Sequence, residues 1–147
     1  MNQETIAERL AAVTKGKQYT GSLTPYAVQS ILKGRSNYPI ANLVTFCQDS
    51  DIRIEMSDMA TEDCFYPESV LDVHKILDLL MKRYNIDYKL VYRKTGAHYT
   101  APKSFDEAEL EKMKAQQNDN RSVTPLSVKT LLAVCEVIHC DLRFIPK

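Results

Sequence analysis

Apolar residues recur every three to four positions along most of the chain, a spacing that predicts amphipathic helices. In the first of them, expected over residues 3–17, the apolar positions are Ile6, Leu10 and Val13. Thr24 followed by Pro25 gives a capping hydroxyl and then a proline at the first helical position, and Thr124 with Pro125 repeats this signal. Further helices are expected from Pro39, over 68–84 and over 104–116.

Two short segments alternate apolar and polar residues instead, which is typical of half-buried strands. They are residues 52–56 and 142–144, and we expect them to pair with each other or across a dimer. The segment 87–95 fits both a strand and a helix. Tyr88, Leu90 and Tyr92 alternate as in a strand, whereas Tyr88, Val91 and Tyr92 also fit a helix that Gly96 would cap.

The end of the first half of the chain is repeated about 90 residues later. The sequence LVTFCQ at 43–48 aligns with LLAVCE at 131–136, and IRI at 52–54 aligns with LRF at 142–144. We interpret the match as an internal duplication, the alternative being a coincidence between common helix patterns. The expected domains are a unit over 1–57, a polar and acidic linker over 58–67, and a second unit over 68–147.

Charge and hydropathy narrow the classes of function. The chain has 147 residues, with 19 basic and 19 acidic side chains, so its zero net charge exerts no long-range attraction on nucleic acid. Any binding of DNA therefore requires a local basic patch. No apolar run approaches the roughly 18 residues needed to cross a bilayer, and the N-terminus does not resemble a signal peptide. We expect a cytoplasmic protein without a membrane partner.

The cysteines and histidines do not follow the spacing of a metal site. Cys47 and Cys135 fall on apolar helix stripes and are expected to be buried, reduced thiols. His139, Cys140 and Cys135 would lack a fourth ligand for zinc. No nucleotide-binding loop, HExxH motif or nucleophile motif occurs. The sequence predicts no catalytic residues, no metal and no cofactor, and hence no enzyme.

The segment TPYAVQSILKGRSNYPIANLV, from Thr24, resembles the recognition helix and following turn of the Cro/phage-repressor-like (Xre-type) helix-turn-helix family. The second half is similar to the same family through KILDLLMKRYNI at 75–86, DYKLVYRKTG at 87–96, the segment 104–116, and VTPLSVKTLLAVCEVIHCDL at 123–142. The first unit departs from the pattern because its second helix is missing or very short. The second unit has an insertion, 97–103, inside the turn. The resemblance implies a mainly α fold of two tandem, diverged helix-turn-helix units, each with a short C-terminal strand.

A recognition helix presents its N-terminal residues to base edges while nearby basic groups hold phosphates. The window 15–35 contains four basic residues and no acid, and glutamine pairs well with adenine. We therefore expect DNA contacts in this region. The candidate residues are Lys15, Lys17, Tyr26, Gln29, Ser30, Lys33, Arg35, Asn37 and Tyr38. The alternative is a solvated basic loop.

The second unit is less suited to DNA, because its recognition-position helix carries acids such as Glu107 and Glu109 that would repel phosphate. The preceding basic stretch, 82–103, is interleaved with tyrosines. These are Tyr84, Tyr88, Tyr92 and Tyr99. They either stack bases or seal a small core, and we favour the core. The second unit is interpreted as having kept the fold and turned toward packing or partner binding.

The leading hypothesis is sequence-specific binding of double-stranded DNA by a dimeric transcriptional regulator. A dimer is expected because one such unit covers too little DNA. The alternative is a protein-interaction module, antitoxin-like or a phage accessory factor, that has kept the fold without binding DNA. DNA binding requires Lys15, Lys17, Lys33 and Arg35 to converge on the face that shows Gln29, whereas dispersed basic residues favour the interaction module.

Overall fold

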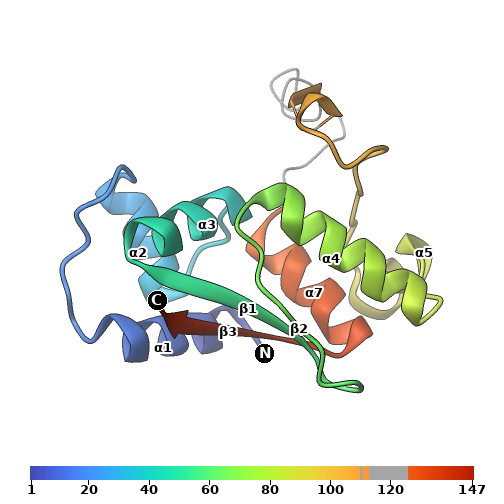
Figure 1. Ribbon diagram of the computed structural model, residues 1–147, viewed down its shortest axis with the longest axis horizontal. Coiled ribbons are helices and arrows are strands. Elements are labelled where there is room, and N and C mark those ends of the chain that lie inside the picture. Colours follow the sequence, from blue (N-terminus) through green and yellow to red (C-terminus); the bar gives the residue numbers. More distant parts are fainter. Residues whose placement is uncertain (110, 113–125) are drawn as a thin grey trace.

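The computed structural model describes residues 1–109, 111–112 and 126–147. Within these ranges the chain is mainly helical with one small antiparallel sheet, as the sequence predicts (Figure 1). The helices are α1 (Gln3–Thr14), α2 (Pro25–Lys33), α3 (Ile40–Asp49), α4 (Val70–Arg83), α5 (Tyr88–Thr95) and α7 (Val128–Ile138). The strands are β1 (Ile52–Asp58), β2 (Cys64–Phe65) and β3 (Cys140–Pro146). None of the helices in the described ranges has the length and apolar character needed to cross a bilayer.

The start and end of α2 follow the sequence signals. The hydroxyl of Thr24 accepts a hydrogen bond from the backbone N–H of Ala27, and Pro25 occupies the first turn. Gly34 ends the helix with a φ of +64°, in the left-handed region that favours glycine. A Cβ at Gly34 would also lie 2.7 Å from the carbonyl oxygen of Gln3. Glycine therefore lets the end of α2 approach the start of α1.

The two strands predicted from alternation pair with each other within the chain. β1 is the central strand of the sheet, with β2 on one side and β3 on the other. β1 and β3 are antiparallel from Ile52 opposite Pro146 to Asp58 opposite Cys140. The outer edge of β3 lies beside α1, where the guanidinium of Arg9 donates a hydrogen bond of 2.5 Å to the carbonyl oxygen of Leu142.

Residues 58–67, expected to be a linker, instead form a turn and the second strand of a β-hairpin. β1 continues to Asp58, whose backbone N–H donates to the carbonyl oxygen of Asp63. The carboxylate of Asp58 is fully buried and accepts hydrogen bonds from Arg83 and Tyr84 at the end of α4. Of the three acids in this segment, Asp58 forms a buried ion pair that fixes the hairpin against α4, whereas Glu62 and Asp63 are exposed in the turn.

The ambiguous segment 87–95 is helical. The side chain of Asp87 caps α5 by accepting a hydrogen bond from the N–H of Leu90, and Gly96 ends the helix in the left-handed conformation. Of the helix expected over 104–116, residues 107–109 and 111–112 are helical, and the remainder lies largely outside the described residues. The last helix begins later than expected: Ser127 caps α7, whereas Thr124 and Pro125 lie outside the described residues.

No helix forms between α1 and α2, over residues 17–23, in agreement with the prediction for the first unit. The loop is instead attached to the end of α3. The hydroxyl of Tyr19 donates to the carboxylate of Asp49, and the ring of Tyr19 stacks on Phe46 with centroids 5.2 Å apart. The N–H of Ser22 also donates to Asp49. These contacts fix the approach to α2 without a second helix.

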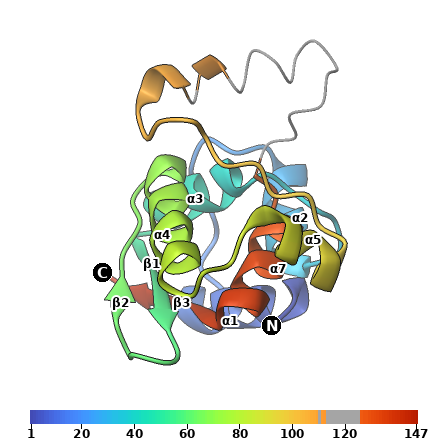
Figure 2. The same ribbon diagram turned by 90° about the vertical axis from the view of Figure 1, so that its right-hand side faces the viewer.

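Both halves contribute to one hydrophobic core. It contains fully buried residues from α1, α2, α3, α4, α7 and both long strands, such as Ile6, Ile31, Met56, Leu77 and Leu142. α2 and α5 lie at opposite ends of the long axis (Figure 1), and both lie on the side away from the strands (Figure 2). The shared core therefore holds these two helices in a fixed relation.

Candidate nucleic-acid interface

α2 has one buried and one exposed side. Ile31 is fully buried in the core, while Tyr26, Gln29 and Lys33 follow one another at helical spacing along the exposed side. The side chain of Tyr26 is 75% exposed, high for a large aromatic residue. α2 is thus anchored by its apolar side and presents an aromatic, an amide and a cationic group to solvent.

The exposed groups of α2 make no hydrogen bond or ion pair with any other residue that the structure describes. This holds for the Tyr26 hydroxyl, the Gln29 amide and the Lys33 ammonium group. They contribute little to the stability of the fold. Their donors and acceptors therefore remain available to a ligand.

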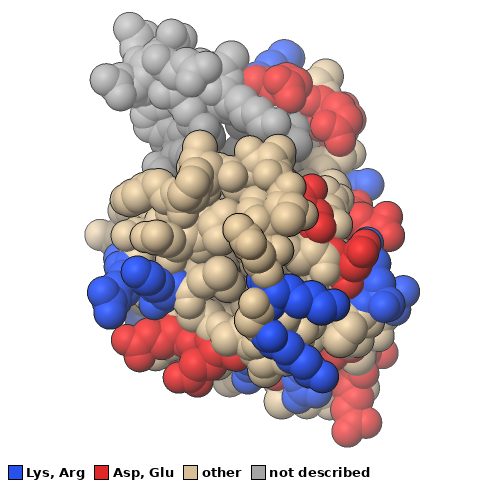
Figure 3. Space-filling model, turned by 90° about the vertical axis from the view of Figure 1, so that its left-hand side faces the viewer, with Lys and Arg blue, Asp and Glu red and all other residues tan. Residues whose placement is uncertain are grey.

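The four basic residues of this region form two pairs rather than one patch, so they do not all converge on the face that shows Gln29, as DNA binding was expected to require. Lys15 and Lys17 are exposed just after α1, whereas Lys33 and Arg35 flank Gly34, which lies against the first residues of α1. Because α1 has 12 residues, its two ends are about 16–18 Å apart. Figure 3 shows basic side chains in separate groups on this end of the molecule, with acidic side chains beside them and an uncharged surface above.

Three residues that were expected to contact DNA are instead buried or bound to other parts of the protein. Ser30 is buried, and its hydroxyl donates to the carbonyl oxygen of Tyr26 at 3.1 Å. Tyr38 is also buried, and burial raises the pKa of its hydroxyl well above the ordinary value. Asn37 is exposed, but its side-chain oxygen accepts a hydrogen bond from the N–H of Lys129 in α7. Ser30 and Tyr38 are therefore not part of an exposed DNA-binding face, and Asn37 helps to join the halves.

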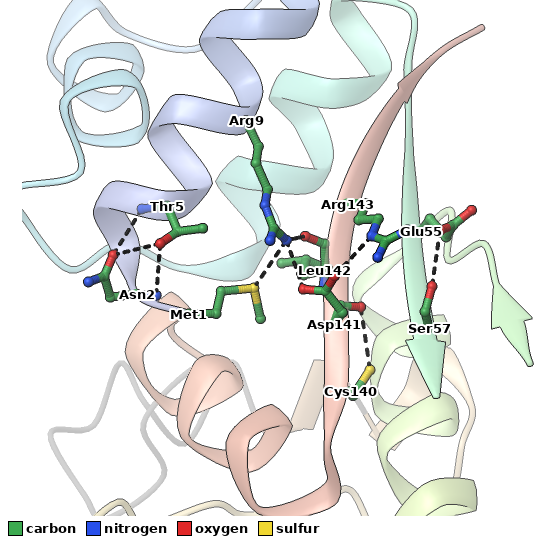
Figure 4. A network of polar contacts seen from close by, with 10 residues as sticks. All are labelled: Met1, Asn2, Thr5, Arg9, Glu55, Ser57, Cys140, Asp141, Leu142 and Arg143. Carbon is green, nitrogen blue, oxygen red and sulfur yellow. Dashed lines mark hydrogen bonds and ion pairs between the residues drawn. The ribbon is translucent and has the colours of Figure 1, made fainter. Parts of the chain in front are cut away.

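The network in Figure 4 fixes α1, and with it the helix α2 that packs on α1. Arg9 reaches from α1 to β3, where it lies 2.8 Å from the carboxylate of Asp141, and Arg143 lies 2.9 Å from the second oxygen of that carboxylate. Burial alone would raise the pKa of Asp141, but hydrogen bonds from Arg9 and Arg143 hold it below its ordinary value. Asp141 therefore stays ionised and joins the first half to the last strand.

The second half does not present an equivalent of α2 among its described residues. The helical residues 107–109 and 111–112 include Glu107, Glu109 and Glu111, and this segment lies apart from α5 in both views (Figures 1 and 2). In the described part of the chain α5 packs against α7, and no helix at the recognition position packs against α5. Acidic side chains at this position would in any case repel phosphate.

The four tyrosines of the second half divide into two classes. Tyr99 is buried, with its hydroxyl 2.8 Å from Nδ1 of His74, and Tyr84 binds the buried carboxylate of Asp58. The core interpretation is correct for these two. Tyr88 and Tyr92 are instead 61% and 50% exposed on α5. The helical option for 87–95 grouped both tyrosines with Val91, but only Val91 is buried.

The predicted buried thiols are confirmed for Cys47 and Cys135, which are both free cysteines inside the core. Burial raises the pKa of the Cys47 thiol to about 12, so it is uncharged at neutral pH. We therefore assign these two cysteines a packing role.

The chain has no significant match among protein-family models, curated proteins or solved structures.

Proposed function

We propose that this protein binds double-stranded DNA through α2 and acts as a transcriptional regulator. The observation that carries the proposal is the exposed row of Tyr26, Gln29 and Lys33 on a helix whose other side is buried in the core. An α-helix of this kind fits the major groove of DNA, where side chains reach base edges.

The three side chains suit distinct contacts. The amide of Gln29 is able to pair with adenine through two hydrogen bonds, and the hydroxyl of Tyr26 and the ammonium group of Lys33 suit phosphate oxygens. The major groove is about 12 Å wide, so phosphates border the inserted helix on both sides. In this proposal Lys33 and Arg35, at the end of α2, supply the phosphate contacts beside Gln29, whereas Lys15 and Lys17 lie near the other end of α1 and are not required.

Strand pairing between two copies is not part of this proposal. One edge of β3 pairs with β1, and the other edge faces α1, where Leu142 accepts a hydrogen bond from Arg9. Of the two options that the sequence left open, the strands pair with each other within one chain and not across a dimer.

The alternative function is a protein-interaction module, and the charge distribution is the observation that favours it. The chain has zero net charge, and its basic pairs are separated, with acidic side chains nearby (Figure 3). Such a surface attracts DNA only over short distances. The two functions differ in their dependence on salt, because only phosphate contacts release condensed counterions.

The test is the fluorescence anisotropy of labelled random duplex DNA, titrated with the full chain between about 50 and 200 mM salt. We expect affinity to fall with salt, and the double variant Lys33→Glu with Arg35→Glu to bind at least about tenfold more weakly. The matched control is Arg53→Glu with Lys147→Glu, which changes two exposed cations beside β1 by the same charge. Circular dichroism checks that each variant is folded. A salt slope near zero, or an equal loss in the control, would overturn the proposal.

A further inference from the structure

α5 has an unusually exposed side for a helix in a small protein. Val91 is its one fully buried residue, while Tyr88 and Tyr92 are exposed one turn apart. Lys89, Arg93 and Lys94 are exposed on the same short helix. At 100° per residue, Tyr88, Tyr92, Lys89 and Arg93 share one side of the helix, whereas Lys94 lies on the opposite side. We call the first four residues the α5 face.

The cations of the α5 face have no acidic partner among the described residues. The nearby acids are already engaged: Asp87 caps the start of α5, and Asp78 pairs with Lys82 at 2.9 Å. The helix dipole accounts for basic residues in the last turn, such as Arg93 and Lys94. It does not account for Lys89 near the start of the helix, nor for the exposed tyrosines.

Tyr88 and Tyr92 lie beside the cations of the α5 face. The ring of Tyr92 stacks on His98 with centroids 4.3 Å apart, which holds both rings at the end of the helix. The hydroxyl of Tyr88 makes no hydrogen bond to a described residue. Phenol hydroxyls beside ammonium and guanidinium groups are the donors that bind phosphate oxygens of a nucleic-acid backbone.

The position of α5 connects it with α2. The two helices lie at opposite ends of the long axis (Figure 1), on the same side of the molecule, away from the strands (Figure 2). A straight, negatively charged polymer that runs along this side therefore passes both helices. Duplex DNA has that form and carries one charge per about 1.7 Å of its axis.

We propose that the α5 face binds the sugar–phosphate backbone of the same duplex that α2 contacts, so that one chain covers two neighbouring stretches of DNA. This inference rests on the proposed function. The α5 face supplies affinity and orientation, whereas α2 supplies the choice of sequence. It also gives the second half a role in binding without a recognition helix of its own.

The test compares the wild-type chain with the double variant Lys89→Gln and Arg93→Gln. Glutamine keeps a long side chain and a good helix propensity, so the variant is expected to fold, as circular dichroism will show. Anisotropy is measured with duplexes of about 10 and about 20 base pairs over a range of salt. We expect the wild type to gain affinity on the longer duplex beyond the statistical gain, and the variant to lose that gain. The slope of log K against log salt should decrease by about two.

Two controls separate the possible failures. Arg53→Gln with Lys147→Gln alters cations on the strand side and should change neither the slope nor the gain with length. If the wild type binds no DNA, the proposed function fails and the α5 proposal fails with it. If the wild type binds and the double variant keeps both its slope and its gain with length, only the α5 proposal is overturned. The same holds if the double variant loses binding to polyglutamate but not to DNA, which would assign the face to an acidic protein partner.

Discussion

Ile54 of β1 lies opposite Phe144 of β3, and these two residues occupy equivalent positions in the repeated motifs IRI and LRF. Pro39 and Ser127 are a second pair of equivalent residues, and they form an isolated antiparallel β-bridge with each other. Each of them directly precedes the first residue of its helix. Contact between equivalent residues is what a two-fold relation between two halves produces. The geometry thus supports the interpretation of the repeat as a duplication.

If the two halves share one core, a change at this pair should destabilise the whole molecule. Phe144 is buried where β3 meets β1, so Phe144→Ala should lower the free energy of unfolding by about 3–5 kcal/mol. Urea denaturation, followed by circular dichroism, should still show a single transition. Tyr26→Ala, at a residue that is mostly exposed, should change stability by less than about 0.5 kcal/mol. Two separate transitions would contradict the shared core.

The elements of this fold could be predicted where a local signal decides them. The spacing of Ile6 and Leu10, and the cap formed by Thr24 with Pro25, act within one or two turns, so both helices were predicted. The alternation in 52–56 and 142–144 predicted both long strands, although their pairing within the chain remained one of two options. Local periodicity does not specify the partner of a strand.

The remaining features depend on contacts between distant residues. The acidic segment 58–67 reads as solvated until Arg83 and Tyr84, about 25 residues away, are seen to bind Asp58. Ser30 fits a recognition position by sequence, but its hydroxyl bonds back to the preceding turn and is buried. Tyr88 and Tyr92 could not be assigned to the surface while 87–95 fitted both a strand and a helix.

His74 should make stability depend on pH between about 6.5 and 4. Its ring is buried beside Tyr99, and burial lowers its pKa to about 4 from an ordinary value near 6.5. The unfolded chain therefore binds the proton first as pH falls, so the stabilisation is complete above pH 6.5 and is lost progressively down to pH 4. The expected loss is about 3 kcal/mol, measured by urea denaturation at a series of pH values. His74→Gln should flatten the profile in this window, and an unchanged profile would contradict the assignment.

Asp58 should govern stability in a more acidic window. Burial alone would raise the pKa of its carboxyl, but hydrogen bonds from Tyr84 and Arg83 hold it well below the ordinary value near 3.9. Its contribution is thus present above about pH 4 and is lost as pH falls further, when the unfolded chain takes up the proton first.

The variant Asp58→Asn tests this assignment at neutral pH. It should lower the free energy of unfolding by about 3 kcal/mol, because it leaves the Arg83 charge without its buried partner. It should also weaken the dependence on pH below pH 4. Asp63→Asn is the matched control: Asp63 pairs with the same guanidinium but is largely exposed, so its loss should cost less than about 1 kcal/mol. Equal effects of the two variants would argue against a special role for the buried carboxylate.

Gln29 and Lys33 lie one turn apart on α2, yet the proposed function assigns them different effects on binding. Gln29→Ala should reduce discrimination between a selected DNA site and random duplex by about 1–3 kcal/mol and leave the salt dependence unchanged, since an amide releases no counterion. Lys33→Ala should instead weaken binding to both DNAs equally and decrease the salt slope by about one. Selection of a site from a randomised library, followed by anisotropy at several salt concentrations, measures both quantities. If Gln29→Ala and Lys33→Ala had the same effect on specificity, α2 would hold the DNA backbone without reading its sequence.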